Sequence, residues 1–334
     1  MKDEKRGIAV AGSLIADTFY KIDTYPKSGT LANVWDRTMH IGGTGNLIQD
    51  LARLDAKLTV KVSAIVGDDD NGKMIRERLS KYANIDLGNL TVEGESAQTL
   101  VMNAQDTKER TFFTIPGAND VFEEKYIDWD HIDAKIFQME YILLMGKVDG
   151  PDAEFGTHGA RILHEAKQRG MKTSIDIVSS KNEHAKDIIS CALKYTDYCS
   201  INETEAELAT GITVAPDGEF CEEKVKEAML DLKEKGISEW IVIHSPKCSY
   251  GYDCKTDQFL RVPSLKLPDG YIKGTNGAGD AYCSGILYGA YQNYSLEQSM
   301  RLATACAACS LSELNGTDGL RPVEQVWELE KQFR

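Results

Sequence analysis

The chain has 334 residues, 42% of them hydrophobic and 27% charged, and its 52 acidic and 38 basic residues give a formal net charge of −14. This composition is typical of a folded globular protein with one large domain or two smaller ones, and it argues against a disordered chain. The negative charge disfavours non-specific nucleic-acid binding, because phosphate contacts need clustered lysine and arginine. No apolar run approaches the roughly 20 residues of a membrane helix, so we expect no membrane partner.

The N-terminus and the cysteines predict a cytoplasmic protein. The first seven residues are mostly charged, and the apolar run that follows, Ile8–Leu14, is short and contains Gly12 and Ser13. A secretory signal peptide has a longer apolar run followed by a cleavage site of the A-x-A type, and this segment shows no such site. The eight cysteines are scattered, which predicts reduced thiols. Cys306 and Cys309 form a C-x-x-C in a small-residue helical stretch, where we expect tight helix packing rather than a zinc or redox site.

Short apolar runs rich in β-forming residues alternate with helical patterns along the chain. This alternation predicts an α/β fold, with a central, mostly parallel sheet covered by helices on both faces. The expected strands are Ile8–Leu14, Leu58–Val66, Tyr141–Met145, Thr173–Val178, Tyr198–Ile201 and Trp240–His244. The expected helices are Glu154–Arg169, Glu222–Lys235, Asp280–Tyr291, Leu296–Leu311 and Val323–Phe333.

Residues 16–40 and 98–115 break the alternation. They contain period-two segments such as Thr99–Asn103 and Arg110–Ile115. We expect these segments to form a small extra sheet, inserted into a single domain over residues 1–334, that covers a site as a lid. An ordinary extension of the main sheet is the alternative, and the sequence alone does not separate the two.

The segment with the most chemical information is Gly270–Gly285, in which a glycine-rich turn runs directly into a helix. The backbone N–H groups of Gly277, Ala278 and Gly279 at this helix N-terminus would form an anion hole. Asp280 beside the hole is placed to accept the proton of a hydroxyl that attacks a phosphoryl group held there. An aspartate that only begins the helix is the alternative. The chain has neither a P-loop nor, at these glycines, the dinucleotide pattern G-x-G-x-x-G.

Several motifs in chain order resemble those of the ribokinase/PfkB family of carbohydrate kinases. They are Gly12–Asp17 (first strand and substrate aspartate), Ile41–Asn46 with Asp50–Leu54 and Val66–Gly72 (first signature), Ile201–Glu205 (the N-x-x-E element) and Gly274–Asp280 (the second signature, whose usual form is D-T-x-G-A-G-D). The likeness extends from residue 8 to about residue 312, which is nearly the whole chain.

This resemblance implies a ribokinase-like fold and transfer of the γ-phosphate of ATP to a hydroxyl of a sugar or sugar-like molecule. It implies that Asp280 is the catalytic base, with the anion hole supplied by Gly277, Ala278 and Gly279. The residues that would line the acceptor site are Asp17, Gly42, Gly43 and Asn46. The resemblance also suggests a homodimer joined through the lids, and a monomer is the alternative that the sequence leaves open.

The nucleotide side follows from the same resemblance. Asn202 and Glu205 would organise Mg²⁺ near the phosphates, with Glu205 as the metal residue, and the same spacing is that of a helix capping box. Ser245 and Thr275 are further candidates for contacts with ATP.

The sequence departs from the family pattern at three places. Gly274 stands where the second signature has aspartate, which leaves the need for a monovalent cation open. The run Gly42–Asn46 is one residue shorter than the common G-G-x-x-x-N, and His244, Pro246 and Ser249 replace the family's T-x-G-x-x-G. The last departure supports an alternative, a non-catalytic sugar- or nucleotide-binding regulatory protein on the kinase scaffold, and a nucleoside kinase of the same family is another. We expect the carbohydrate kinase, because base, anion hole and metal element are all present.

Overall fold

A nine-stranded sheet forms the centre of the computed structural model, which describes residues 7–107, 109–180 and 182–334. The charged segment 1–6 therefore lies outside the described residues. The strand order is β15-β14-β13-β12-β11-β8-β1-β4-β5. The strands are β1 (Ile8–Gly12), β4 (Val60–Val66), β5 (Ile85–Val92), β8 (Ile136–Ile142), β11 (Lys172–Ile177), β12 (Tyr198–Asn202), β13 (Trp240–His244), β14 (Cys248–Asp253) and β15 (Gln258–Pro263). All pairings from β5 to β13 are parallel, and only β14 and β15 pair antiparallel at one edge.

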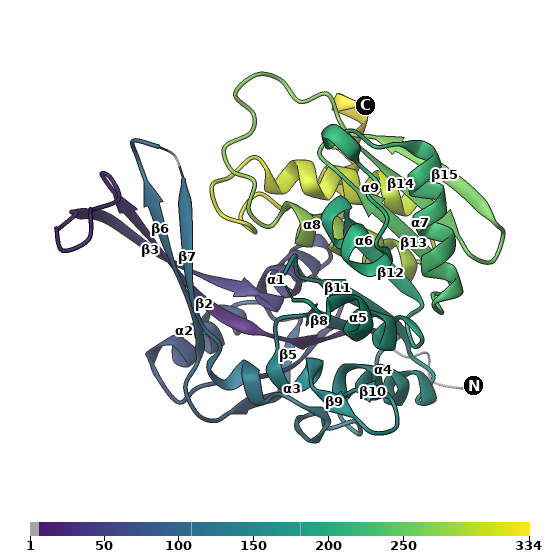
Figure 1. Cartoon of the computed structure of the whole chain (residues 1–334), viewed down its shortest axis with the longest axis horizontal. Helices are drawn as coiled ribbons and strands as arrows, with labels where there is room; N and C mark the ends of the chain where they lie inside the picture. Colours follow the sequence, from purple (N-terminus) through teal and green to yellow (C-terminus); the bar gives the residue numbers. More distant parts are fainter. Residues whose placement is uncertain (1–6, 108, 181) are drawn as a thin grey trace.

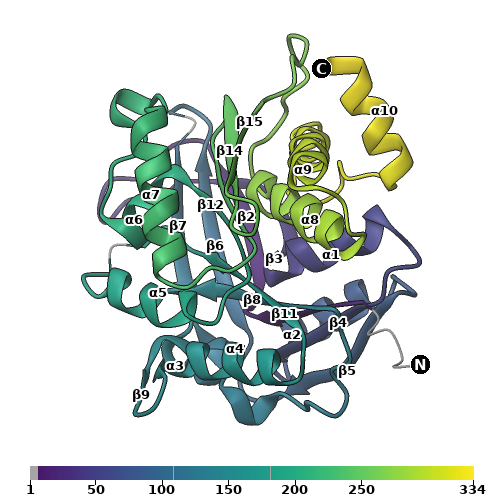
Figure 2. The same cartoon turned by 90° about the vertical axis from the view of Figure 1, so that its right-hand side faces the viewer.

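Helices cover both faces of this sheet, as Figure 2 shows. One face carries α3 (Gly146–Asp149), α4 (His158–Gln168), α5 (Ala185–Leu193), α6 (Glu203–Thr210) and α7 (Glu222–Glu234), and the other carries α1 (Thr44–Leu54), α2 (Asp70–Leu79), α8 (Ala278–Tyr291), α9 (Leu296–Ser310) and α10 (Val323–Phe333). Strand β1 shows why both faces are covered: Ala9 and Ala11 belong to one apolar core cluster, whereas Ile8 and Val10 belong to the other. A strand buried on both faces is typical of a parallel sheet, and the predicted three-layer α/β fold is confirmed.

A separate four-stranded sheet in the order β3-β2-β6-β7 projects from one side of the body (Figure 1). Its strands are β2 (Leu14–Ile22), β3 (Val34–Gly43), β6 (Ala97–Ala104) and β7 (Arg110–Ile115). They overlap segments 16–40 and 98–115, although β2 begins two residues earlier than the first segment and β3 extends beyond it. Their action as a lid stays a prediction.

The expected strand Ile8–Leu14 is two strands, because the chain changes direction at Gly12. The φ angle of Gly12 is 148°, and a Cβ atom there would lie 1.4 Å from the carbonyl oxygen of Glu140. Only glycine fits at this crossing, which leads β1 of the central sheet directly into β2 of the small sheet.

Two other expected boundaries are wrong. The strand expected at Tyr141–Met145 ends at Ile142 and begins at Ile136, because Leu143 has a φ of 76° and turns the chain out of the sheet. The helix expected from Glu154 begins at His158, because the Thr157 hydroxyl caps it by accepting a hydrogen bond from the backbone N–H of Ala160 at 3.1 Å.

Helices α8 and α9 pack closely, as the small-residue stretch predicts. Cys306 and Cys309 are fully buried in α9, and all eight cysteines are free thiols. A Cβ atom on Gly285 of α8 would lie 2.4 Å from the Cα of Ala303 in α9, so glycine permits the close approach of the two backbones. Among the described helices, none combines the length and the apolar character that crossing a membrane requires.

Candidate active site

A cavity of about 270 Å³ opens at the carboxyl ends of the parallel strands. Its lining comes from β8, from the end of β11 and the two residues that follow it, from β12, α6 and β13, and from the first turn of α8. The lining residues are Tyr141, Asp176, Ile177, Val178, Ser179, Ser200, Asn202, Glu205, His244, Gly277, Gly279 and Asp280. The strand order of the central sheet reverses at β1. Strands β4 and β5 lie on one side of β1, and β8 with the later strands lies on its other side. Ligands of α/β proteins bind at the carboxyl ends of the strands beside such a reversal of strand order.

The first turn of α8 presents backbone donors to this cavity. Gly277 precedes the helix with a φ of 71° and lies so close to Gly316 that a Cβ atom would be 2.6 Å from that residue's Cα. At Gly279 the nearest atom to an added Cβ is Cε1 of His244 at 4.0 Å, so this side of the turn is open. Because Gly277 has no side chain to cap the 14-residue helix, its first N–H groups are available to an anion.

Asp280 is buried at the edge of this turn and is held at both carboxylate oxygens. Asn46 Nδ2 donates a hydrogen bond to Oδ2 at 3.0 Å, and the Tyr141 hydroxyl donates a short hydrogen bond to Oδ1. Burial raises the pKa of Asp280, and the hydrogen bonds from Tyr141 and Asn46 oppose that rise.

Among the residues expected at the acceptor site, Asn46 contacts Asp280 and the charge of Asp280 acts on Asp17. None of the four, Asp17, Gly42, Gly43 and Asn46, is among the described residues that line the cavity. A Cβ atom on Gly42 would lie 2.0 Å from Oδ2 of Asp17, so glycine is what allows the carboxylate to lie against the backbone of β3. Burial raises the pKa of Asp17 to about 7, against the hydrogen bond of Thr99, which lowers it. Gly43 has a φ of 60° and leads β3 into α1, which places Asn46 on the first turn of that helix. Asn46 thus contacts Asp280.

Asn202 and Glu205 form the capping box of α6 and also line the cavity. Asn202 Oδ1 accepts hydrogen bonds from the N–H groups of Thr204 at 2.9 Å and Glu205 at 3.0 Å, and Glu205 Oε2 accepts one from the N–H of Asn202 at 2.9 Å. Burial raises the pKa of Glu205 to about 7. The donor set is all oxygen, which is what Mg²⁺ prefers, and Oε2 keeps a lone pair for a metal-bound water. Capping and metal binding are therefore compatible in this pair.

Three buried carboxyl groups beside Asp280 were not identified from the sequence. One carboxylate oxygen from each of Glu140, Asp176 and Asp280 lies within 4.8 Å of the other two. Asp50 of α1 is fully buried, and neither of its carboxylate oxygens has a hydrogen-bond partner in the described part of the chain. Burial raises the pKa of all three well above its ordinary range. Glu140 and Asp176 lie at or near the carboxyl ends of β8 and β11, so a search for polar residues at strand ends would have found them.

The candidate ATP contacts Ser245 and Thr275 lie outside the cavity lining, whereas His244, one of the residues that depart from the family pattern, lines the cavity. His244 lies beside Asn202 in the sheet, lines the cavity, and has its ring centroid 4.7 Å from that of Tyr282. Burial lowers the pKa of His244 to about 4, so the ring is neutral at physiological pH. Ser245 instead turns back into its hairpin, with Oγ donating to the carbonyl of Cys248 at 3.1 Å, and Thr275 is exposed. Neither of these two residues is part of the cavity lining.

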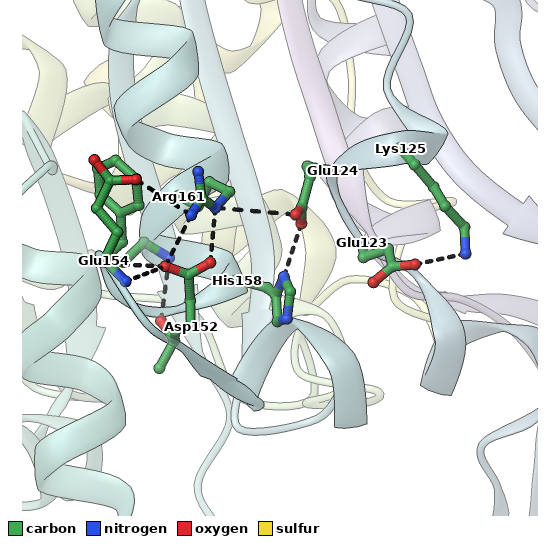
Figure 3. A network of polar contacts seen from close by, with 10 residues as sticks. Glu123, Glu124, Lys125, Asp152, Glu154, His158 and Arg161 are labelled. Carbon is green, nitrogen blue, oxygen red and sulfur yellow. Dashed lines mark hydrogen bonds and ion pairs between the residues drawn. The ribbon is translucent and has the colours of Figure 1, made fainter.

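A second group of acidic and histidine side chains lies away from the cavity, between the turn Glu124–Tyr126 and α4 (Figure 3). Glu124 Oε2 lies 2.9 Å from His158 Nδ1, and Arg161 Nε donates to Asp152 at 2.7 Å. Glu123 is paired with Lys125 at 2.5 Å. These pairs join the beginning of α4 to the preceding turn and contribute nothing to the cavity.

Comparison with known proteins gives the family of the chain. Residues 5–322 match the family model described as pfkB family carbohydrate kinase. Ribokinase from Haemophilus influenzae is 24% identical over 324 residues, which cover 96% of this chain and 97% of that protein. A 91-residue segment, 27% of this chain, is 31% identical to 28% of the 1-phosphofructokinase of Escherichia coli K12.

Solved structures share the fold. Arabidopsis thaliana ribokinase complexed with ribose and ATP has a TM-score of 0.78 at 19% identity, and Thermotoga maritima ribokinase has 0.77 at 20%; each match covers 98% of this chain and 99% of the other. A Methanocaldococcus jannaschii nucleoside kinase has 0.76 at 18%, over 98% of both chains. The family model covers most of the sequence and includes every candidate site residue. The chain belongs to the pfkB family of carbohydrate kinases.

Proposed function

We propose that the protein transfers the γ-phosphate of ATP to a hydroxyl group of an uncharged sugar or sugar-like polyol, with Asp280 as the base. The observation that carries the proposal is the position of Asp280, whose carboxylate shares one cavity with the open first turn of α8. Phosphoryl transfer needs little covalent chemistry from the protein and depends on positioning and on charge stabilisation. A base and an anion hole on the same helical turn supply both.

In this mechanism the acceptor hydroxyl lies against Asp280 and attacks the γ-phosphorus. The new O–P bond forms as the bond from phosphorus to the β–γ bridging oxygen breaks, ADP leaves, and the hydroxyl proton passes to Asp280. The N–H groups of Gly277, Ala278 and Gly279 stabilise the charge on the phosphoryl oxygens. Asn202 and Glu205 would hold Mg²⁺ through its water shell, and the ion would neutralise phosphate charge when bound.

The groups beside Asp280 support an uncharged acceptor. The candidate acceptor residues include the carboxyl group of Asp17, the side chains that hold Asp280 are the neutral Asn46 and Tyr141, and among the described residues neither lysine nor arginine is hydrogen-bonded to Asp280. A second phosphate or a carboxylate on the acceptor would meet like charges at low dielectric constant. Hydroxyl groups, in contrast, donate hydrogen bonds to buried carboxylates, so a sugar relieves the repulsion that a sugar phosphate increases.

The small sheet is proposed as a lid that closes the acceptor side. Arg110 of β7 donates a hydrogen bond to Oδ1 of Asn276 at 2.6 Å, which connects the sheet to the residue just before the anion hole. A lid in contact with this turn would exclude water that otherwise competes with the acceptor for the γ-phosphate.

The same sheet is proposed to join two copies of the chain. Its apolar side chains are unusually exposed, with Trp35 57%, Phe112 59% and Phe113 52% accessible. Exposed apolar patches of this kind mark interaction surfaces. Light scattering should give the mass of a dimer for the parent chain and of a monomer for a Trp35→Ser/Phe113→Ser variant; a monomeric parent contradicts this proposal. We also place the protein in the cytoplasm, on the ground that its eight cysteines are free thiols.

The activity is tested by coupled detection of ADP, with MgATP and a panel of sugars, polyols, sugar phosphates, sugar acids and nucleosides. Release should require an uncharged acceptor and should be lost in Asp280→Asn, which keeps the shape of the side chain but removes the proton acceptor. The melting temperature of this variant should equal or exceed that of the parent, because the change removes one of several crowded carboxylates. Asp257→Asn, at an exposed carboxylate, is the control and should retain full activity.

Each other outcome assigns a different function. A response to nucleosides alone would make the protein a nucleoside kinase. ADP release in Asp280→Asn at the parental rate would remove the base from its proposed role. Binding of MgATP by calorimetry without transfer to any acceptor would support a regulatory protein on the kinase scaffold.

A further inference from the structure

The contact between Tyr141 and the base has no counterpart in the motifs that identify this site. Tyr141 is the sixth residue of β8, and its hydroxyl donates to Oδ1 of Asp280 while Asn46 of α1 donates to Oδ2. The carboxylate is thus fixed from two elements that belong to different parts of the fold. Asn46 belongs to the first signature, but Tyr141 lies outside every motif found in the sequence.

The surroundings of Asp280 give this contact a function. Carboxyl groups from several elements face or approach the base, and the described residues place no lysine or arginine in direct contact with it. They are Asp17 on β2, Asp50 on α1, Glu140 on β8, Asp176 on β11 and Glu205 on α6. Burial together with like charges favours the protonated acid. A protonated Asp280 cannot accept a proton, so the site needs groups that favour the carboxylate.

Tyr141 is suited to this task because its own proton is secure. Burial and the neighbouring negative charges raise the pKa of the phenol far above its ordinary value, so the hydroxyl stays a donor throughout the working pH range. A donor that cannot ionise stabilises the charged form of its partner more than the neutral form.

We propose that Tyr141 is a positioning residue that holds Asp280 ionised and directs its free lone pairs toward the acceptor hydroxyl. The inference rests on the proposed function of Asp280 as base. Tyr141 keeps its proton during transfer, and the proton of the acceptor goes to Asp280. Removal of the phenol oxygen leaves the ring in the cavity wall but takes away one of the two donors that hold the base.

The variant Tyr141→Phe tests this role through pH profiles of kcat and KM at saturating MgATP. A hydrogen bond to a charged group changes the pKa of its acceptor by about 1 to 2. The acidic limb of the kcat profile should therefore move to higher pH by about this amount, with roughly tenfold loss of kcat along that limb and recovery toward the parental rate in alkali. Tyr288→Phe on the same helix as the base is the control, since its hydroxyl donates to Asp55 at 3.0 Å outside the cavity, and its profile should match that of the parent.

A loss of kcat that is equal at every pH, or a parental profile in Tyr141→Phe, overturns the proposal. A second measurement does not depend on turnover. Carbon-13 NMR of aspartate carboxyls, with the Asp280 signal assigned by its absence in Asp280→Asn, gives the pKa of the base directly. A higher pKa in Tyr141→Phe supports the positioning role even if no acceptor is found, and an unchanged pKa refutes it even if the enzyme is active.

Discussion

Glu205→Gln is expected to stabilise the ligand-free protein at alkaline pH while it weakens the response to Mg²⁺. Glu205 is 7% exposed, and burial raises its pKa from 4.5 to about 7. Because the folded state binds this proton more tightly than the unfolded state, the contribution of Glu205 to stability is present below about pH 4.5. It is lost as the pH rises through about 7.

The magnitude follows from the difference between the two pKa values. A difference of about 2.5, at about 1.4 kcal/mol for each pKa unit, makes the ionised side chain cost about 3 kcal/mol of unfolding free energy at pH 8. Glutamine removes that cost and still caps α6 through the N–H of Asn202. It loses the hydrogen bond from Asn202 Nδ2, which reaches Glu205 Oε1 at 2.6 Å, at a cost of about 1 kcal/mol. The variant should therefore be about 2 kcal/mol more stable near pH 8 and about 1 kcal/mol less stable near pH 4.5.

Urea unfolding followed by circular dichroism, in EDTA at several pH values, measures this change of sign. Added Mg²⁺ should stabilise the parent at pH 8 and should have little effect on the variant. Glu203→Gln, at a partly exposed carboxylate in the same helical turn, is the control and should change stability by less than about 0.5 kcal/mol. A Glu205→Gln protein that is less stable than the parent at every pH would refute the argument, because capping would then outweigh the buried charge.

Three further changes test other parts of the structure. Gly42→Ala forces the carboxylate of Asp17 to move and should raise KM for the acceptor at least about tenfold, with KM for ATP unchanged in initial-rate kinetics. Gly285→Ala pushes α8 from Ala303 and should lower the unfolding free energy by about 1–3 kcal/mol in urea titrations; a parental midpoint contradicts the close packing. Arg110→Ala should raise the ratio of acceptor-independent ATP hydrolysis to transfer, measured as phosphate against sugar phosphate, and an unchanged ratio would remove the lid from its proposed role.

Much of the fold could be predicted from the sequence, because hydrophobic periodicity and the positions of glycine residues determine local structure. Strand β13 and helix α10 have the predicted bounds, since each is set by its own residues and by turn or cap residues beside it. The boundaries that differ depend on contacts distant in the chain. Gly12 ends β1 because the carbonyl of Glu140 occupies the space of a side chain, and no pattern near Gly12 encodes that carbonyl.

The site follows the same division. Gly277, Ala278, Gly279 and Asp280 are contiguous, so a motif contains them, whereas Glu140 and Tyr141 approach Asp280 from a strand some 140 residues earlier in the chain. Asn46 illustrates the intermediate case: the motif identifies the residue, but only the packing of α1 against α8 shows that it donates to Asp280. A role that consists of contact between two elements cannot be derived from either element alone.

We expect the charge of the cavity to determine whether the phosphate donor ATP binds alone or together with a cation. Asp176, Glu205 and Asp280 already crowd one cavity in which the described lining offers no cationic side chain, so a free triphosphate would add charges of the same sign. The helix N-terminus at Gly277 carries only about half a positive charge, which is far less than the charge of the triphosphate. We propose that a divalent cation bound with the nucleotide supplies the missing positive charge. Donor affinity should therefore depend on the metal more strongly than on any single side chain of the cavity.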